Sequence, residues 1–507
     1  MGKKSKKQKD AAAAAVTGKR SSTSEHKELS KASKKEVMEL ATKMLEFCSK
    51  PIPPGPKEIE DFPEIYSMVE KIRGIQTDIT LTQPDRVACI PAFMEWLNNN
   101  EVDTSAIEIE NFQHVGYGIK ATKNLKEMDP FVIVPRKLML TTDTAKASGL
   151  DALIAEDKIL QAMPSIVLAL HLLCERRSTE SYWKPYLDML PSQYTTPLYF
   201  TPEELALLKG SPAYKDCVNQ YRNIARQYAY FYRVLHNHPA AAKLPIKDCF
   251  TYYDYRWAVS TVMTRQNQVP TPDGDSLTFA LIPLWDMCNH CNGTITTDYN
   301  IEDDSCECFA LRDFTKGEQI MIFYGARSNA ELLIHSGFVY PENEWDRIAV
   351  KLGISKGDPL FEQKSDLLMK LGLEVSRSFF IHRGRFPLDP QILAFLRVFC
   401  MSDENLKEFQ SAPLTEEKME SLGDVSSPVS IENDEKVWSF LETRSALLQK
   451  AYDTTAQEDE ELLKSADFNE NQKLLISLRM CEKKILLSTQ TFAKTMKEKL
   501  TLKESND

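Results

Sequence analysis

The sequence predicts an α+β fold in which a β-rich domain contains a long helical insert and precedes a helical C-terminal domain. Short β-rich runs occur at 131–134 and 319–323, and residues 142–266 between them have mainly helical patterning. After residue 345 the pattern is mostly helical again. Because 507 residues exceed what one hydrophobic core usually organises, we expect at least two folded domains.

The chain begins with a basic tail. Residues 1–34 are predicted to be disordered, and residues 1–35 contain eleven Lys or Arg against three acids, whereas the whole chain has a net charge of −11. A nuclear signal or a phosphate-binding patch has this composition, but a solvated tail is the more common case. Residues 35–104 are predicted to be an N-terminal helical segment, with helices at about 35–49 and 57–74 separated by the Pro-rich linker 51–56.

Two larger regions follow. Residues 105–345 are predicted to form the β-rich domain around the insert at about 142–266, and residues 346–507 the helical domain. In the latter, the apolar run 392–399 and the charged amphipathic tract 435–500, interrupted near 456, predict helices. Residues 403–434 are rich in Ser, Glu, Pro and Asp and are predicted to contain a mobile loop.

Composition excludes several classes of protein. The chain has no run of ~20 apolar residues and no apolar signal-peptide core near its start. Its eleven cysteines lack a dense periodic framework, which indicates reduced thiols in a soluble intracellular protein. The acidic body argues against a nucleic-acid surface spread over the fold, because such a surface needs clustered Lys and Arg. The negative net charge is more compatible with a protein substrate than with a nucleic acid.

The first candidate motif is Gly116-Tyr117-Gly118, which follows a β-rich run. Glycine lets the backbone approach a ligand closely, but a lone Gly-x-Gly is more often a hairpin turn. The motif lacks the third glycine of a dinucleotide-binding fingerprint, which disfavours a Rossmann fold.

The second motif begins with the apolar run 281–285. The polar residues Asp286, Asn289 and His290 follow this run, at the point where the chain is expected to leave the core. Buried polar groups need partners, and a ligand can supply them. A polar network that only fixes a loop is an equally common reason for such a run.

The third motif, the β-rich run 318–325, decides between these interpretations. It places the Tyr324 hydroxyl at a strand end beside Gly325, which permits a sharp reversal of the chain.

These three motifs, in this order and spacing, resemble those of SET-domain methyltransferases. In that family the Gly-x-Gly, Asn-His and terminal tyrosine motifs converge on S-adenosylmethionine and on the target nitrogen. The helical insert and the C-terminal block are similar to the subgroup typified by the Rubisco large-subunit lysine methyltransferase, whose C-terminal domain binds the protein substrate. The resemblance covers residues 80–500 and implies S-adenosylmethionine as the cofactor, a SET fold at 105–345 and an all-α substrate-binding domain at 346–507.

Residues 226–232, 262–268 and 322–330 resemble a narrower branch of this family, whose members methylate a histidine of actin. This resemblance implies methyl transfer to the distal (tele) ring nitrogen of a specific actin histidine, with monomeric actin as partner and without nucleic acid or membrane. It also implies a mainly cytoplasmic protein, and the basic tail leaves the nucleus open as a second location.

The resemblance also assigns roles to individual residues. Asn267 hydrogen-bonds the proximal ring nitrogen, so that the lone pair of the distal nitrogen faces the methyl group, and Tyr324 closes the pocket beside the ring. Substrate contacts are assigned to Arg226, Trp285, Ile322 and Arg327. Cofactor contacts are assigned to Arg86, Val115, Gly116, Tyr117, Arg265, Asp286, Met287, Cys288, Asn289, His290, Ser336, Gly337 and Phe338. Taken singly, Trp285 is more often core packing and the arginines are more often surface ion pairs.

A histidine nucleophile needs little from the enzyme beyond orientation of its ring. Its reference pKa of ~6.5 leaves it mostly neutral at pH 7, whereas a lysine near 10.4 must first lose a proton at roughly 4 to 5 kcal/mol. We therefore expect residues that orient the ring and no dedicated base.

Three alternatives stay open. Cys288 and Cys291, with Cys306 and Cys308 nearby in sequence, have the thiolates for a zinc site, but a Cys-x-Cys strand lacks the usual knuckle turn and we expect no metal. A protein lysine methyltransferase is the second alternative. A non-catalytic module that binds a protein through its helical domain is the third, and the retention of Asn289, His290 and Tyr324 weighs against it.

Overall fold

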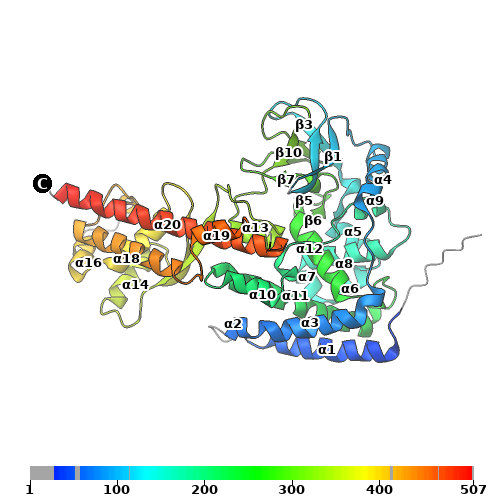
Figure 1. Cartoon of the computed structure of the whole chain (residues 1–507), viewed down its shortest axis with the longest axis horizontal. Helices are drawn as coiled ribbons and strands as arrows, with labels where there is room; N and C mark the ends of the chain where they lie inside the picture. The colour runs from blue at the N-terminus through cyan, green and yellow to red at the C-terminus, as the bar shows by residue number, and fades with distance from the viewer. Residues whose placement is uncertain (1–27, 52–56, 114, 412–414, 466, 505–507) are drawn as a thin grey trace, which may run out of the picture.

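The computed structural model describes residues 28–51, 57–113, 115–411, 415–465 and 467–504, and it is α+β as predicted. Figure 1 shows a large mixed body and a smaller, mainly helical body joined by the long C-terminal helix. Most of the predicted basic tail and the linker at 52–56 lie outside the described residues. No described helix is both long enough and apolar enough to cross a membrane.

The N-terminal helices pack on the helical insert. α1 (Lys31–Ser49) begins at Ser30, whose hydroxyl accepts a hydrogen bond from the Ser33 amide at 3.1 Å. Its buried face lies against α11 (Pro212–Asn237), a helix of the insert. α3 (Phe62–Gln76) also contacts α11. The other elements of this segment are α2 (Lys57–Glu60), α3 (Phe62–Gln76), η1 (Thr77–Ile79) and α4 (Arg86–Asn99).

Three small sheets form the β-rich domain. One has the order β1-β2-β10-β7, with β1 (Ile107–Phe112), β2 (Gly116–Ala121), β10 (Gln319–Ile322) and β7 (Asn289–His290). The second is β3 (Pro130–Pro135), β9 (Ser305–Phe309) and β8 (Thr297–Asn300), and the third is β4 (Leu140–Thr141), β6 (Leu277–Leu281) and β5 (Asn267–Pro270). The predicted run at 131–134 thus falls in β3, and the run at 319–323 falls in β10 except for its last residue.

One strand pairing brings two of the sequence motifs together. β7 runs parallel to β10, with Met321 opposite Asn289 and Ile322 opposite His290. β2 pairs with the other edge of β10. The Gly-x-Gly, Asn-His and tyrosine motifs therefore meet in a single four-stranded sheet.

The helical insert begins at Thr142 and ends with α12 at Arg265. α8 and α12 pack against each other and are buried over most of their length, which explains their apolar sequences. The insert comprises α5 (Thr142–Lys146), α6 (Asp151–Glu156), α7 (Lys158–Ala162), α8 (Pro164–Arg177), α9 (Lys184–Leu187), η3 (Pro197–Tyr199), α10 (Pro202–Leu205), η4 (Ala206–Leu208), α11 (Pro212–Asn237), η5 (Pro239–Ala241) and α12 (Tyr252–Arg265). Because β5 starts at Asn267, the end of α12 leads directly into a strand.

The C-terminal domain is mostly helical, but the expectation that it is all-α is wrong in one respect. β11 (Arg347–Gly353) and β12 (Ser376–His382) form a two-stranded antiparallel sheet, because Ile348, Val350 and Leu352 alternate with more exposed residues and bury one face. The helices of the domain are α14 (Phe361–Lys370), α15 (Pro390–Cys400), α16 (Asp403–Gln410), α17 (Glu416–Ser421), α18 (Ile431–Gln449), α19 (Ala456–Leu462) and α20 (Glu470–Glu504).

The segment 403–434, predicted to contain a mobile loop, includes helices as well, and its residues 412–414 lie outside the described residues. Most of its described residues belong to α16, α17 and the start of α18. Ser402 and Thr415 cap the first two helices by accepting hydrogen bonds from the Asn405 and Lys418 amides. Helix caps have the same polar composition as loops, so composition alone did not reveal these helices.

The hydrophobic core consists of two clusters. Apart from two residues of α20, one cluster consists of residues in the range 37–334 and the other of residues in the range 348–500. Leu475 and Leu478 at the start of α20 belong to the first cluster, whereas later residues of α20 belong to the second. α20 therefore connects the two bodies, as Figure 1 shows.

Candidate active site

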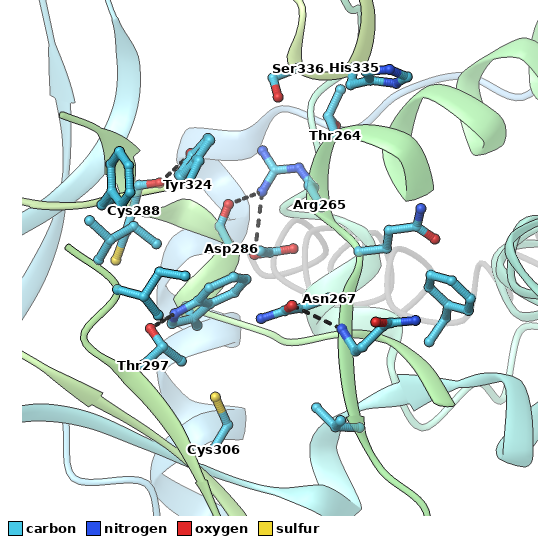
Figure 2. A pocket seen from close by; sticks show the side chains of 18 of the residues that line it. Thr264, Arg265, Asn267, Asp286, Cys288, Thr297, Cys306, Tyr324, His335 and Ser336 are labelled. Atoms are coloured by element: carbon cyan, nitrogen blue, oxygen red, sulfur yellow. Dashed lines mark hydrogen bonds and ion pairs between the residues drawn. The ribbon is translucent and has the colours of Figure 1, made fainter. Parts of the chain in front are cut away.

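A pocket of about 800 Å³ opens where the end of α12, β5, β8, β10 and α13 (Asn329–Ser336) meet. Figure 2 shows side chains from these segments pointing into it. Nine of the residues predicted for the site line its wall: Arg265, Asn267, Trp285, Asp286, Cys288, Ile322, Tyr324, Arg327 and Ser336.

The chain enters this site through a strained turn. Leu284 has a φ of +69°, which is uncommon for a residue with a branched side chain, and it begins the short helix η6 (Trp285–Met287). This turn carries the backbone from the buried strand β6 to β7. Non-glycine residues with positive φ are frequent near functional sites, where surrounding packing holds the strain.

Asp286 and Arg265 form a buried ion pair at the base of the pocket (Figure 2). Arg265 Nη1 lies 3.3 Å from Asp286 Oδ1 and donates to the Asp286 carbonyl oxygen at 2.6 Å. Tyr186 donates its hydroxyl to Asp286 Oδ2 at 2.5 Å. Burial raises the pKa of Asp286, but the Arg265 guanidinium and the Tyr186 hydroxyl act in the opposite direction. The carboxylate is thus held by one hydrogen bond from Tyr186 and by the ion pair with Arg265.

A second arginine adds positive charge beside this pair. Burial and the neighbouring Arg265 lower the pKa of Arg86 to about 10, so it remains cationic at pH 7. Its Nε donates to the Met189 carbonyl at 2.8 Å, and its guanidinium lies 4.4 Å from the centre of the Tyr117 ring. The buried Nε of Arg265 has no hydrogen-bond partner among the described residues. Such a group suits a bound carboxylate.

The Gly-x-Gly motif lies against the Asn-His motif. Asn289 Nδ2 donates to the Tyr117 carbonyl at 3.3 Å. A Cβ on Gly118 would lie 2.8 Å from Asn289 Nδ2 and 2.4 Å from Gln319 Nε2, so a larger residue does not fit there without movement. Gly116, with a φ of +77°, starts β2 at the hairpin turn. The motif therefore serves as a turn and as a point of close packing.

Tyr324 is fixed by two contacts at the pocket wall. Its hydroxyl donates to the Cys288 carbonyl at 2.6 Å, and its amide donates to His290 Nδ1 at 3.1 Å. Burial raises the pKa of Tyr324, so its hydroxyl stays protonated. Burial and nearby Arg327 lower the pKa of His290 to about 4, which leaves Nδ1 free to accept. The Phe338 ring packs edge-on against Tyr324.

Asn267 and Trp285 also line the pocket. Asn267 Oδ1 accepts a hydrogen bond from the Gln268 amide at 2.9 Å, which fixes the side-chain amide. Trp285 Nε1 donates to Thr297 Oγ1 at 2.9 Å, which fixes the indole plane. The pocket thus has an amide and a flat aromatic surface, both already oriented.

The carboxylates in the pocket wall are engaged by the protein. Glu331 accepts from the Ser328 amide and from Arg347 Nη2 at 2.6 and 2.8 Å, while Asp286 is held as described above. Asp298 Oδ1 accepts from the Tyr299 amide at 2.8 Å. The geometry therefore favours orientation of a neutral nucleophile over removal of a proton by a wall carboxylate.

Comparison with known proteins identifies the family. Residues 116–325 match the SET domain model, and residues 355–486 match the model described as Rubisco LSMT substrate-binding. The actin-histidine N-methyltransferases of Homo sapiens and Gallus gallus are each 50% identical over 455 residues, or 90% of this chain and 77% of each relative. That of Otolemur garnettii is 49% identical over 486 residues, or 94% of this chain and 82% of the relative. The chain belongs to the actin-histidine N-methyltransferase family.

Solved structures support the same fold. The SET domain of LSMT bound to lysine and AdoHcy has a TM-score of 0.65 at 23% identity, over 81% of this chain and 92% of that chain. Rubisco LSMT bound to AdoMet has a TM-score of 0.62 at 24% identity, over 81% and 93%. The predicted resemblance to SET-domain methyltransferases with a Rubisco-methyltransferase-like C-terminal domain is confirmed.

Some predicted site residues of this family member lie outside the pocket wall. Val115 is half exposed on the β1–β2 turn, Met287 is buried in the core, and Gly337 ends α13 with a φ of +78°. Arg226 does not line the pocket either: it is exposed on α11, where its Nη2 lies 3.4 Å from Asn223 Oδ1, one turn earlier. The structure therefore gives no support for Arg226 in the pocket wall.

The sequence reasoning also missed residues. Tyr186 and Thr297 hold Asp286 and Trp285 in place, but no motif in the sequence marks either one. Tyr186 lies 100 positions before its partner, so only the folded chain brings them together. As for zinc, the described residues contain no group of three or more His, Cys, Asp or Glu arranged to hold a metal ion.

Proposed function

We propose that this protein is an S-adenosylmethionine-dependent methyltransferase that modifies the distal ring nitrogen of a specific histidine in actin. Membership of the actin-histidine N-methyltransferase family supports the activity and the protein substrate. The observation that carries the choice of histidine is the pocket wall formed by Asn267 and Trp285, which presents a fixed amide and a flat aromatic surface to one small ring.

The residues beside the pocket fit the cofactor. Arg265 has a buried Nε without a partner, and the Ser336 hydroxyl is likewise buried and unpartnered among the described residues. Together with Arg86 they would bind the carboxylate and polar atoms of S-adenosylmethionine, and the backbone beside Asn289 and His290 would bind its adenine edge. When bound, the cofactor supplies an electrophilic methyl group on a sulfonium.

Asn267 would set the tautomer of the substrate ring. Its Oδ1 atom accepts one hydrogen bond from the Gln268 amide and retains a second lone pair. That lone pair can accept the proximal N–H of a neutral imidazole, which leaves the distal nitrogen with a free electron pair. The asparagine thus selects which nitrogen reacts without moving a proton.

Tyr324 would hold the ring in line for the displacement. Its hydroxyl and amide are both hydrogen-bonded, so the aromatic ring has a fixed position beside the pocket. Orientation of this kind, with reacting atoms a few ångströms apart, is a large part of the rate enhancement of bimolecular reactions.

Lysine methylation is the second candidate. The observation that favours it is the fold, because a similar solved structure is an LSMT SET domain bound to lysine. A lysine nucleophile would need to lose its proton, and the carboxylates described in the pocket wall are already engaged.

The deciding experiment is to incubate the protein with unmodified actin and labelled cofactor and to map the modified residue by mass spectrometry. We expect a single methylated histidine and a rate that levels off above pH ~6.5, where imidazole is neutral. Trimethyl-lysine without methylhistidine, with a rate that rises tenfold per pH unit towards ~10, would establish the alternative.

Further details of this proposal are the use of monomeric actin, the absence of any need for nucleic acid or membrane, and a cytoplasmic and nuclear location. Fluorescence imaging of the tagged full-length protein tests the location directly. Comparison of rates on monomeric and filamentous actin tests the form of the substrate.

A further inference from the structure

The C-terminal domain contains a strand with an open edge. In the described part of the chain, β11 pairs with β12 alone. A strand with one neighbour presents a row of backbone donors and acceptors on its other side. Such an edge can add an extended peptide as a further strand.

The register shows which residues of β11 face this edge. The Arg383 amide donates to the Asp346 carbonyl at 2.8 Å, and the Ile354 amide donates to the Val375 carbonyl at 3.1 Å. Both bonds join residues that are opposite each other in the register of β11 and β12, one at each end of the ladder. In antiparallel strands, opposite residues alternate between hydrogen-bonded and non-hydrogen-bonded pairs. The even-numbered residues therefore bond to β12, and the backbone groups of Ala349, Lys351 and Gly353 face the open edge.

A second pocket lies beside this edge. It has a volume of about 320 Å³, enough for one aromatic or large aliphatic side chain, and Lys351, Leu352 and Gly353 form one wall. The facing wall comes from α15 and α18, where the rings of Phe399 and Phe440 lie 4.9 Å apart. We call this cavity the edge pocket.

The chemistry of the edge pocket favours an acidic and apolar ligand. Its lining includes two cations, Lys351 and Arg444, and no acid. The Nε atom of Arg444 is buried and has no hydrogen-bond partner among the described residues. A carboxylate would satisfy this group. Because the whole chain carries a net charge of −11, a local excess of cations distinguishes this pocket from the rest of the protein and favours an acidic ligand.

The open edge continues from the active site. Arg347 is the first residue of β11, and its Nη2 lies 2.8 Å from Oε2 of Glu331, which lines the active-site pocket. The seven residues of β11 span about 20 Å from that point to the edge pocket. A single substrate protein can therefore contact both pockets.

We propose that the open edge of β11 and the edge pocket dock an extended segment of the same protein substrate whose histidine enters the active site. The segment adds to β11 as a strand, places an aromatic or large aliphatic side chain in the edge pocket, and sets a carboxylate against Lys351 and Arg444. This inference rests on the proposed function, because the occupant is the methylated protein itself.

The test replaces one backbone donor at the open edge. In Lys351→Pro the edge loses an N–H and a cation, while the bonds of Leu352 and Val350 to β12 remain. Ser378→Pro is the matched control, since Ser378 is opposite Lys351 and its backbone faces the outer edge of β12. Each variant is assayed with intact actin and with a short synthetic peptide that contains only the target histidine and its neighbours.

For intact actin we expect the KM of Lys351→Pro to rise about tenfold, with less than a twofold change for the short peptide. Ser378→Pro should match the unmodified protein on both substrates. Arg444→Gln, which leaves the strand untouched, should also raise the KM for actin alone and covers the case in which Lys351→Pro fails to fold. Unchanged KM for actin in Lys351→Pro and Arg444→Gln, or an equal rise for peptide and actin, would overturn the docking proposal. If the unmodified protein methylates neither substrate, the proposed function itself fails.

Discussion

The Tyr324 hydroxyl donates a 2.6 Å hydrogen bond to the Cys288 carbonyl oxygen, across 36 positions of sequence. This contact joins the end of the β10 segment to the turn that precedes β7. It places an aromatic ring and a backbone carbonyl at one point of the pocket wall, so the ring cannot move away from the wall without breaking this hydrogen bond.

Tyr324→Phe should therefore lower kcat by tenfold or more on actin. The variant keeps the ring but loses the hydrogen bond that fixes it. The Cys288 carbonyl then lacks this donor, which costs ~1 to 3 kcal/mol of free energy. Steady-state kinetics with saturating cofactor measures the effect. Activity equal to that of the unmodified protein would show that the hydroxyl does not hold the reacting geometry.

Asn267→Ala should reduce kcat/KM for actin by about 10- to 100-fold, because the proximal N–H of the substrate ring loses its acceptor. The dissociation constant of S-adenosylmethionine, measured by calorimetry, should change by less than about twofold, which separates substrate orientation from cofactor binding. Asn223→Ala, an exposed change on α11, is the control. Loss of cofactor binding in Asn267→Ala would refute the role assigned to this residue.

Tyr186→Phe should weaken cofactor binding by about tenfold while the protein stays folded. The variant removes the 2.5 Å donor to Asp286, so the Asp286 carboxylate and the Arg265 guanidinium are less rigidly placed. Calorimetric titration with S-adenosylmethionine provides the readout. Tyr182→Phe, which loses only an exposed bond to Asn100, should bind normally; equal weakening in both variants would contradict the prediction.

His290 should make the protein sensitive to acid. Its folded-state pKa of about 4 lies below the ordinary value near 6.5, so the unfolded chain binds an extra proton between these limits. This contribution to stability is present above pH ~6.5 and is lost as the pH falls, by about 2 kcal/mol at pH 5. Thermal melting between pH 7 and 5 should show a smaller decrease for His290→Gln. An identical decrease would indicate that other groups control the acid response.

Arg397→Leu should destabilise the C-terminal domain by about 3 to 5 kcal/mol. The Arg397 side chain is fully buried and its Nη2 pairs with Asp434 Oδ1 at 2.7 Å, so the variant leaves a buried carboxylate uncompensated. Denaturant unfolding followed by tryptophan fluorescence, to which the buried Trp438 of this domain contributes, measures the change. The control Lys436→Ala removes an exposed pair with Glu432 and should cost less than ~1 kcal/mol.

Sequence patterns were sufficient to predict the class of fold and the motifs that meet at the site. Period-two and period-3.6 apolar patterns gave the strands β3 and β10, the helical insert and the C-terminal helices, because burial of one face imposes these spacings. Motif order then indicated a SET domain, and the family match confirmed it. Composition did not reveal the helices within 403–434, because capping residues of α16 and α17 resemble loop residues.

The contacts between side chains, in contrast, are evident only in the folded chain. The hydrogen bond of Tyr186 to Asp286, the fixed indole of Trp285 against Thr297, and the place of Arg226 outside the pocket depend on helix packing. The open edge of β11 depends on which strand pairs with which. A local pattern shows the spacing at which the residues of one segment are buried. Contacts between residues distant in sequence depend on how the whole chain packs, and a local pattern contains no information on that packing.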